Sequence, residues 1–218
     1  MTADLNLNDM DNPWLSIPLE DYEGHMASPE IRQAQMLAES LAEALDIYVP
    51  RSVAILGCAG GNGFTKIPRG FERVVGVDIN PGYLEAAAAR YRGRFATLEL
   101  IAGDLQSDEL RFEPVDLVYA GLVLEYVDVD TAMRRIRAML TPGGRLLTVV
   151  QLPTGGHAHV APSPFGSMQT LGDAMRLVDP ARLRVIATAH RLDQMDSRGI
   201  ADKAGKRFQR QVFVCEPV

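Results

Sequence analysis

The chain has 218 residues, of which 47% are hydrophobic and 23% charged, a composition typical of a globular protein with one buried core. No apolar run approaches the roughly 20 residues of a membrane helix, and the polar, acidic residues 1–12 do not resemble a signal peptide. The formal net charge of −6 disfavours a nucleic-acid partner, because phosphate binding depends on basic patches. Cys58 and Cys215 lie in apolar, strand-like segments and predict neither a disulfide framework nor a metal site. We therefore expect a soluble, cytoplasmic protein that binds neither membrane nor nucleic acid.

Residues 1–28 lack sustained periodicity, but apolar side chains such as Trp14 and Tyr22 predict that this leader packs on the rest of the protein. The sequence 28–30, Ser-Pro-Glu, predicts a helix start with Ser28 as the N-cap and proline at the first helical position. Apolar residues follow at helical spacing, so this helix is expected to run to about Asp46.

From residue 52 onward, short apolar runs alternate with helical segments. Such alternation predicts βαβ units around a parallel sheet. The expected strands are 52–57, 73–78, 96–102, 115–120 and 145–151, the expected helices are 83–91 and 130–140, and 141–144 is expected to be a turn.

The segment after residue 151 has a different pattern. Residues 153–166 are expected to form a loop and 167–177 a helix, and 183–190 and 208–216 are expected to be two strands of a closing antiparallel hairpin. The whole chain, 1–218, is then one domain with three parts. These are a leader at 1–28 that acts as a lid or an anchor, a cofactor-binding core at 52–151, and a substrate-side loop and hairpin at 152–218.

A glycine-rich loop, 57–63, follows the first expected strand directly. Glycine at this place lets the backbone approach a ligand closely, although a tight turn alone can explain it. Asp78 ends the second strand about twenty residues later, where a carboxylate can accept hydrogen bonds from ribose hydroxyls. The alternative for Asp78 is a helix cap, because Asn80 and Pro81 follow. These features fit a nicotinamide-dependent Rossmann oxidoreductase as well as other nucleotide-binding domains.

Two further motifs separate these possibilities. Asp104 ends the third strand, where it can accept from the amino group of adenine, and Pro142-Gly143-Gly144 leads into the fifth. With 55–63 and Asp78, these motifs resemble the class I S-adenosylmethionine-dependent methyltransferases over roughly residues 50–150. The resemblance implies an α/β, doubly wound, mostly parallel seven-stranded sheet (a Rossmann-like methyltransferase fold), here with an N-terminal helical extension.

The resemblance also implies which residues bind S-adenosylmethionine. The sequence departs from the family at Ile55, where an acid is frequent, and at Ala59, where glycine is frequent. The first departure puts one contact to the amino-acid end of the cofactor in doubt, and Asn62 can compensate by hydrogen bonding. The implied cofactor-binding residues are Gly57, Cys58, Ala59, Gly61, Asn62, Asp78, Ile79, Asp104, Leu105 and Ala120.

The sequence supports the candidate catalytic residues less strongly than the cofactor-binding residues. Glu125 and Tyr126 follow the fourth strand and either face the acceptor or begin and cap a helix. His25 and His157 are candidate general bases, because histidine titrates near neutral pH. His157 and His159 have no carboxylate or cysteine spaced to complete a metal site, so no metal is expected.

The expected activity is transfer of the methyl group of S-adenosylmethionine to a small-molecule acceptor. A sulfonium methyl is already activated, so the protein has to align the acceptor and exclude water, and no catalytic side chain is obligatory. Two alternatives stay open: an NAD(P)-dependent oxidoreductase, and a non-catalytic S-adenosylmethionine-binding protein. The basic residues between Lys203 and Arg210 are either a solvated loop and strand edge or a rim for an anionic substrate. The protein is expected to be a monomer or a homodimer.

Overall fold

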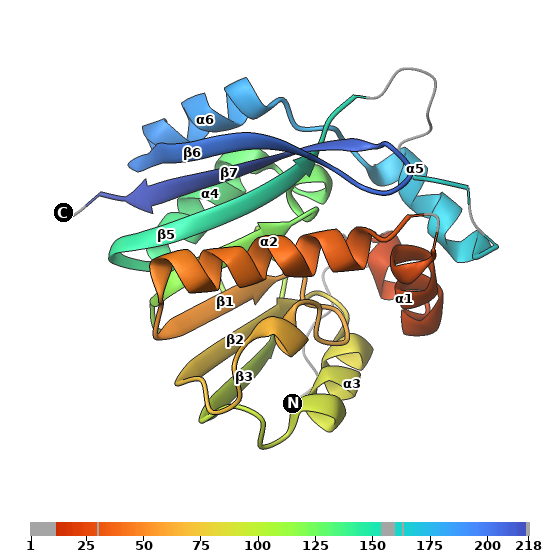
Figure 1. Ribbon diagram of the computed structural model, residues 1–218, viewed down its shortest axis with the longest axis horizontal. Helices are drawn as coiled ribbons and strands as arrows, with labels where there is room; N and C mark the ends of the chain where they lie inside the picture. The colour runs from red at the N-terminus through yellow and green to blue at the C-terminus, as the bar shows by residue number, and fades with distance from the viewer. Residues whose placement is uncertain (1–11, 30, 154–159, 163, 217–218) are drawn as a thin grey trace.

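The computed structural model describes residues 12–29, 31–153, 160–162 and 164–216, which build one seven-stranded sheet in the order β3-β2-β1-β4-β5-β7-β6 (Figure 1). β7 runs antiparallel to both of its neighbours, and the other pairings are parallel. The predicted fold class is confirmed. The strands are β1 (Ser52–Leu56), β2 (Arg73–Asp78), β3 (Thr97–Ala102), β4 (Val115–Gly121), β5 (Leu140–Gln151), β6 (Leu192–Ala201) and β7 (Arg207–Cys215).

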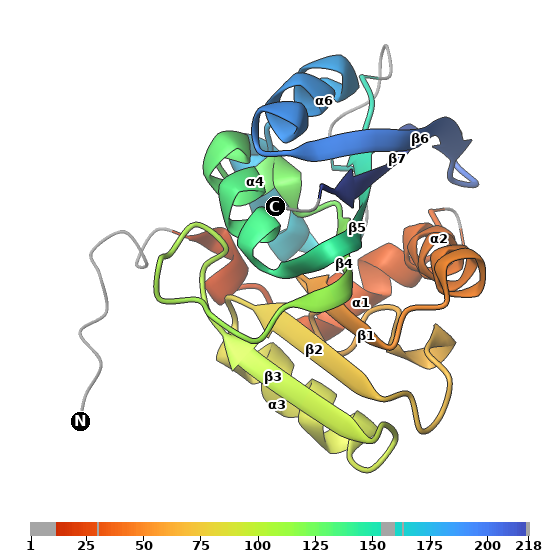
Figure 2. The same cartoon turned by 90° about the vertical axis from the view of Figure 1, so that its left-hand side faces the viewer.

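Helices cover both faces of the sheet. α2 (Gln33–Tyr48) and α3 (Pro81–Tyr91) pack on one face, and α4 (Val129–Ala138) and α6 (Pro180–Ala189) pack on the other. Figure 2 shows α2 on the side of the sheet opposite α4 and α6. Shorter elements are α1 (Leu19–Ala27), α5 (Leu171–Ala174) and the 3₁₀ turns Pro13–Leu15, Phe64–Lys66, Leu124–Tyr126 and Gly166–Thr170.

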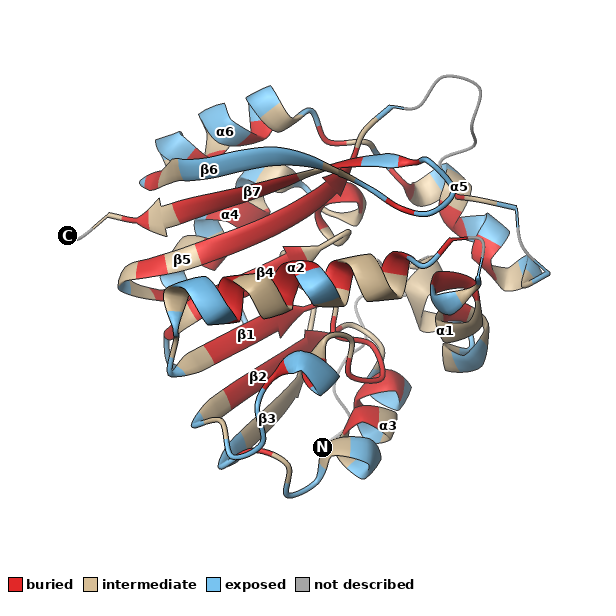
Figure 3. Cartoon of the chain, viewed as in Figure 1, coloured by how far each residue is buried: buried red, intermediate tan, exposed pale blue. Residues whose placement is uncertain are grey.

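The central strands are apolar because both of their faces are buried. In β1, Val53 and Ile55 belong to the core cluster under α2, whereas Ala54 and Leu56 belong to the cluster under α4. Figure 3 shows the same buried strands between helices whose outer faces are exposed. A strand buried on both faces reads as a continuous apolar run, which is why the sequence predicts β1, β2 and β4 well.

The predicted start of the first long helix is wrong. Ser28 is the C-cap of α1, and α2 begins at Gln33, after Arg32 in the left-handed conformation (φ 54°). The Ser28 carbonyl accepts hydrogen bonds from the backbone N–H groups of Ile31 and Arg32 at 3.0 and 2.9 Å. Ser28 therefore lies between two helices and does not cap the start of the second one.

The predicted strand at 183–190 is also wrong, because these residues belong to α6. Asp179 caps this helix by accepting from the N–H groups of Ala181 and Arg182 at 2.7 and 3.0 Å, and Pro180 stands in its first turn. The strand that pairs with β7 is β6, in the segment expected to link the two hairpin strands. A short apolar run fits a buried helix face and a buried strand equally well.

Two smaller expectations also need correction. The Pro-Gly-Gly segment lies inside β5 as an irregularity: β4 advances from Val115 to Leu117 while β5 advances from Leu140 to Arg145. The helix expected at 167–177 is shorter, formed by the Gly166–Thr170 turn and α5. None of the described helices combines the length and apolar character needed to cross a membrane.

Candidate functional site

A pocket of about 730 Å³, counting its open mouth, lies where the carboxyl ends of four parallel strands meet. Each of these strands contributes lining residues at its end, among them Gly57 after β1, Asp78 in β2, Gly103 after β3 and Gly121 in β4. This edge is where ligands bind in open α/β sheets. We call it the first pocket.

Asp78 is the acid of this pocket and is only 8% exposed. Its carboxylate accepts hydrogen bonds from the backbone N–H groups of Ala59 at 2.8 Å and Asn80 at 2.9 Å. Burial raises the pKa of Asp78, and the backbone N–H groups around it oppose that rise. Each carboxylate oxygen has a second lone pair for a ligand. Asn80, and not Asp78, is the side-chain cap of α3, because it accepts from the N–H of Gly82 at 3.0 Å.

The glycine-rich loop passes close to this carboxylate. Gly57 has φ +68°, a left-handed conformation that favours glycine, and the N–H groups of Gly57 and Cys58 donate to the Val77 carbonyl at 2.9 and 3.0 Å. A Cβ atom at Gly57 would also lie 3.3 Å from the side chain of Val123. The loop thus presents bare backbone to the pocket, as close contact with a ligand requires.

Asp104 lines the opposite part of the first pocket, together with Gln106. Asp104 accepts from the backbone N–H of Gln106 at 2.8 Å, and Gln106 in turn accepts from the N–H of Asp128, the cap of α4, at 2.8 Å. These contacts fix the loop after β3 against the start of α4.

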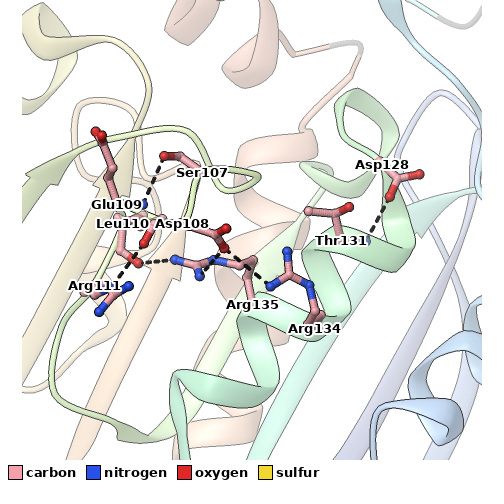
Figure 4. Close-up of polar contacts among 9 residues, drawn as sticks. All are labelled: Ser107, Asp108, Glu109, Leu110, Arg111, Asp128, Thr131, Arg134 and Arg135. Carbon is pink, nitrogen blue, oxygen red and sulfur yellow. Dashed lines mark hydrogen bonds and ion pairs between the residues drawn. The ribbon is translucent and has the colours of Figure 1, made fainter.

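Further along, the same loop is held by charged side chains (Figure 4). Asp108 pairs with Arg135 at 2.8 Å and with Arg134 at 3.4 Å, and Arg135 also donates to the Leu110 carbonyl at 2.6 Å. α4 therefore anchors the loop that carries Asp104.

Aromatic residues of the leader, together with Tyr126, form a wall of the first pocket. The Trp14 ring meets the rings of Tyr22 and Tyr126 edge-on, with centroids 5.7 and 5.0 Å apart. Hydrogen bonds join the leader to α3 and the residue before it. Asn80 donates to the Trp14 carbonyl, and the Tyr83 hydroxyl donates to the Ile17 carbonyl, both at 2.9 Å. An ion pair of Arg90 with Glu23 adds a third tie.

A second pocket, of about 440 Å³ counting its mouth, adjoins the first. Four residues line both pockets: Trp14, Tyr22, Leu122 and Tyr126. The rest of the second pocket combines apolar side chains with buried polar ones. These remaining lining residues are His25, Met26, Gln33, Gln151, Val160, Ala161, Met168, Leu171, Met175 and Lys206.

Six of the ten predicted cofactor-binding residues line the first pocket. Asn62 lines a smaller neighbouring pocket with Ile55, and its amide donates to the Tyr22 hydroxyl at 2.6 Å. Cys58, Gly61 and Ala120 line none of these pockets. The ligand contacts of all ten stay predictions. The six that line the first pocket are Gly57, Ala59, Asp78, Ile79, Asp104 and Leu105.

The candidate catalytic residues lie in different places. His25 lines the second pocket, whereas His157 and His159 lie outside the described residues. Glu125 lines neither pocket and is 1% exposed, and one of its oxygens accepts from the Gln151 backbone N–H at 2.8 Å. Burial raises the pKa of Glu125 to about 7. This position suits a structural carboxyl group better than one that touches an acceptor.

Several lining residues were missed by the sequence reasoning. Tyr83, Gln106 and Val127 line the first pocket without belonging to a recognisable motif. The sequence carries a signal for Trp14, which is the only tryptophan of the chain and lies in the apolar part of the leader. Within the described part of the chain, no three His, Cys, Asp or Glu side chains are grouped to hold a metal ion.

The model of the family described as "Methyltransferase domain" matches residues 55–148. Over 160 residues, the chain is 26% identical to malonyl-[acyl-carrier protein] O-methyltransferase of Dechloromonas aromatica, covering 72% of this chain and 57% of that protein. Over 109 residues, it is 30% identical to an uncharacterized methyltransferase of Mycobacterium bovis, covering 48% of this chain and 54% of that protein. The chain thus spans little more than half the length of these curated relatives.

Among solved structures, the fold is similar to that of the N-methyltransferase NodS from Bradyrhizobium japonicum in complex with S-adenosyl-L-homocysteine. The TM-score is 0.69 at 18% identity, and the match covers 95% of this chain and 100% of NodS. At this identity the likeness establishes the fold, and the match to the family model is confined to residues 55–148.

Proposed function

We propose that the chain is a class I S-adenosylmethionine-dependent methyltransferase that methylates a small molecule with S-adenosylmethionine as the cofactor, in keeping with the family model that matches residues 55–148. The single observation that carries the proposal is the pair of adjoining pockets. The first pocket has a buried acid at the end of β2 and bare backbone after β1. The second pocket opens from it behind a shared wall of aromatic side chains.

The residues of the first pocket fit the cofactor. The Asp78 carboxylate is placed for the ribose hydroxyls, Asp104 for the adenine amino group, and the backbone of the Gly57 loop allows the close approach that a bound nucleoside needs. The family match favours this cofactor over a nicotinamide dinucleotide, the other ligand that an acid at this position fits.

Bound S-adenosylmethionine supplies an activated methyl group on a sulfonium centre. The tasks left to the protein are alignment of the acceptor and exclusion of water. Trp14, Tyr22 and Tyr126 form the wall common to both pockets, where aromatic faces and edges surround the position between cofactor and acceptor. Aromatic rings stabilise a nearby cation and keep water out, so this wall serves both tasks.

The size of the second pocket, about 440 Å³ counting its mouth, suits a small acceptor. The net charge of −6 is also unfavourable for tracking a phosphate backbone. Cys58 and Cys215 are both buried and free, which fits the reducing cytoplasm as the location. We expect a monomer or a homodimer.

Transfer of a labelled methyl group tests the proposal. The protein is incubated with methyl-labelled S-adenosylmethionine and a cell extract, and the label is then measured in the nucleic-acid, protein and low-molecular-weight fractions. We expect label in the low-molecular-weight fraction, unaffected by high salt, and less label with the Asp78→Ala variant when the cofactor is below saturation. Salt-sensitive labelling of nucleic acid, or cofactor binding without transfer to any fraction, would contradict the proposal.

A further inference from the structure

We propose that a third pocket receives the tail of the cofactor, the substituent that carries the amino acid in S-adenosylmethionine, and that this pocket favours an uncharged, apolar tail over a zwitterionic one. The inference rests on the proposed function, because it concerns the ligand of the same site. It adds a class of ligand, the 5′-thioadenosines whose tail is a plain hydrocarbon chain. The third pocket measures about 350 Å³ counting its mouth, and Ile55, Asn62 and Tyr119 are among its lining residues.

The three pockets adjoin one another in the way that a sulfonium centre requires. Its sulfur has three substituents, which are the adenosyl group, the methyl group and the tail. The first pocket fits the adenosyl group, and the methyl group has to point toward the acceptor in the second. The third pocket is left for the tail, since it shares residues with both of the others. These are Leu56, Gly57 and Gly121 with the first pocket and Met26 with the second.

The third pocket is mainly apolar, and none of its described lining residues carries a formal charge. Ile55, from β1, is 1% exposed and belongs to the core cluster under α2. Leu37 and Ala38, from α2, line the pocket as well. These side chains offer no group that can pair with the ammonium or the carboxylate of an amino acid.

The two polar side chains of the third pocket already have hydrogen-bond partners. The Asn62 amide donates to the Tyr22 hydroxyl at 2.6 Å, and the Tyr119 hydroxyl donates to the Leu37 carbonyl at 3.0 Å. Burial raises the pKa of Tyr119, so this side chain stays a neutral phenol. Neither group supplies a charge to the pocket.

The charged side chains beside the glycine-rich loop bind each other. Arg90 pairs with Glu23 and also donates to the Gly60 carbonyl at 3.2 Å, and neither side chain lines any of the three pockets. A zwitterionic tail in the third pocket would therefore leave water without an ion pair to a described lining residue. Burial of an unpaired charge costs free energy, whereas burial of each methylene group is favourable. The third pocket thus suits a hydrocarbon tail.

Calorimetry with three thioadenosines tests this inference on the wild-type protein. S-adenosylhomocysteine has the zwitterionic tail, 5′-butylthioadenosine has an uncharged tail of similar length, and 5′-methylthioadenosine has almost no tail. We expect the butyl compound to bind at least about tenfold more tightly than the methyl compound, because it buries three more methylene groups. We also expect it to bind at least as tightly as S-adenosylhomocysteine.

A variant that fills the third pocket tests where the tail lies. Ala38→Leu, at a position of α2 that lines this pocket, should abolish the preference for the butyl over the methyl compound. Ala42→Leu is the matched control, because Ala42 lies one turn further along α2, is partly buried like Ala38 and lines none of the three pockets. This control should keep the wild-type preference.

Tighter binding of S-adenosylhomocysteine than of the butyl compound would overturn the proposal, as would equal binding of the butyl and methyl compounds. An unchanged preference in a folded Ala38→Leu variant would place the tail elsewhere and also overturn it. If that variant does not fold, the wild-type comparison decides. The proposed function fails in a different way, when none of the three compounds binds, and the inference then fails with it. Tight binding of S-adenosylhomocysteine alone leaves the function standing and removes only the apolar preference.

Discussion

At the residue scale, Asp78 illustrates how one carboxylate can organise a site. It holds the N–H groups of Ala59 and Asn80 and so joins the glycine-rich loop to the start of α3. The sequence alone left two roles open, a ribose ligand and a helix cap. The cap belongs to Asn80, which leaves Asp78 available to a ligand in the first pocket.

Replacing Asp78 tests this role. We expect Asp78→Ala to weaken binding of S-adenosylhomocysteine by roughly tenfold to a hundredfold, because charge-assisted hydrogen bonds contribute about 1.5–3 kcal/mol. Isothermal titration calorimetry measures the change, and Asp46→Ala, at an exposed aspartate of α2, is the control. A folded Asp78→Ala protein with unchanged affinity would exclude Asp78 from the site.

Glu125 predicts a pH dependence of stability. Burial raises its pKa to about 7 in the folded protein, whereas in the unfolded chain it titrates near the ordinary value for glutamate. Between these two pKa values the folded state binds more protons than the unfolded chain does. The contribution of Glu125 to the unfolding free energy is therefore complete at acidic pH and is lost as the pH rises through 7.

We expect Glu125→Gln to flatten the dependence of the unfolding free energy on pH between 5 and 8, by an amount on the order of 3 kcal/mol. Urea denaturation at several pH values measures it. Glu85→Gln, at an exposed position of α3, should keep the wild-type slope. The same slope in Glu125→Gln would show that another group is responsible.

The residues found from sequence were those fixed by a motif at a strand end, such as Asp78 and Asp104. Those missed, such as Tyr83 and Gln106, reach the pocket only through packing of α3 and of the loop held by α4. A local pattern carries no information about such contacts, because they join segments distant in sequence.

At the element scale, the apolar runs predict the buried parallel strands. The errors concern the first 32 residues, the turn at 141–144 and the segment after β5. The sequence predicts a strand in place of α6, because only Leu183 and Ala187 of this short segment are buried and the helical periodicity is weak. The N-cap Asp179 and the following proline were the overlooked signals. The sequence does not predict α1, because two of its three buried side chains, Tyr22 and His25, carry polar groups and so weaken the apolar periodicity.

The leader can be observed directly through Trp14, the only tryptophan, which lines both pockets. We expect tryptophan fluorescence to change on titration with S-adenosylhomocysteine, because the ligand replaces water beside the ring. The same titration followed by calorimetry should show that Trp14→Phe still binds the ligand while the optical signal is lost. Saturation of the wild-type protein without any change in emission would place the leader away from the cofactor.

At the scale of the whole molecule, a single sheet supports both pockets, and the family model matches it from the end of β1 into β5. β6 and β7 complete the sheet and carry the turn with Lys206. The cofactor side is therefore the part that the family motifs predict. The acceptor side depends on the leader, α5 and the last hairpin, where no family motif was found.

Ligand-induced stabilisation distinguishes the two cofactor classes. S-adenosylhomocysteine at about 100 times its Kd should stabilise the fold by roughly 2.7 kcal/mol. For a domain of this size, that corresponds to a rise in Tm of about 5–10 °C. Differential scanning calorimetry should show this rise with S-adenosylhomocysteine and none with NAD at the same concentration. A larger rise with NAD would reverse the assignment.

The aromatic wall that divides the two pockets has a thermodynamic consequence. Trp14 and Tyr22 face both pockets and are tied through Asn80 and Asn62 to the segments around the cofactor. If a ligand in one pocket orders this wall, the other pocket is pre-organised by the same event. Such coupling is reciprocal: the factor by which cofactor tightens acceptor binding must equal the factor by which acceptor tightens cofactor binding. In that case, bound acceptor raises the equilibrium affinity of the cofactor before the methyl group has moved.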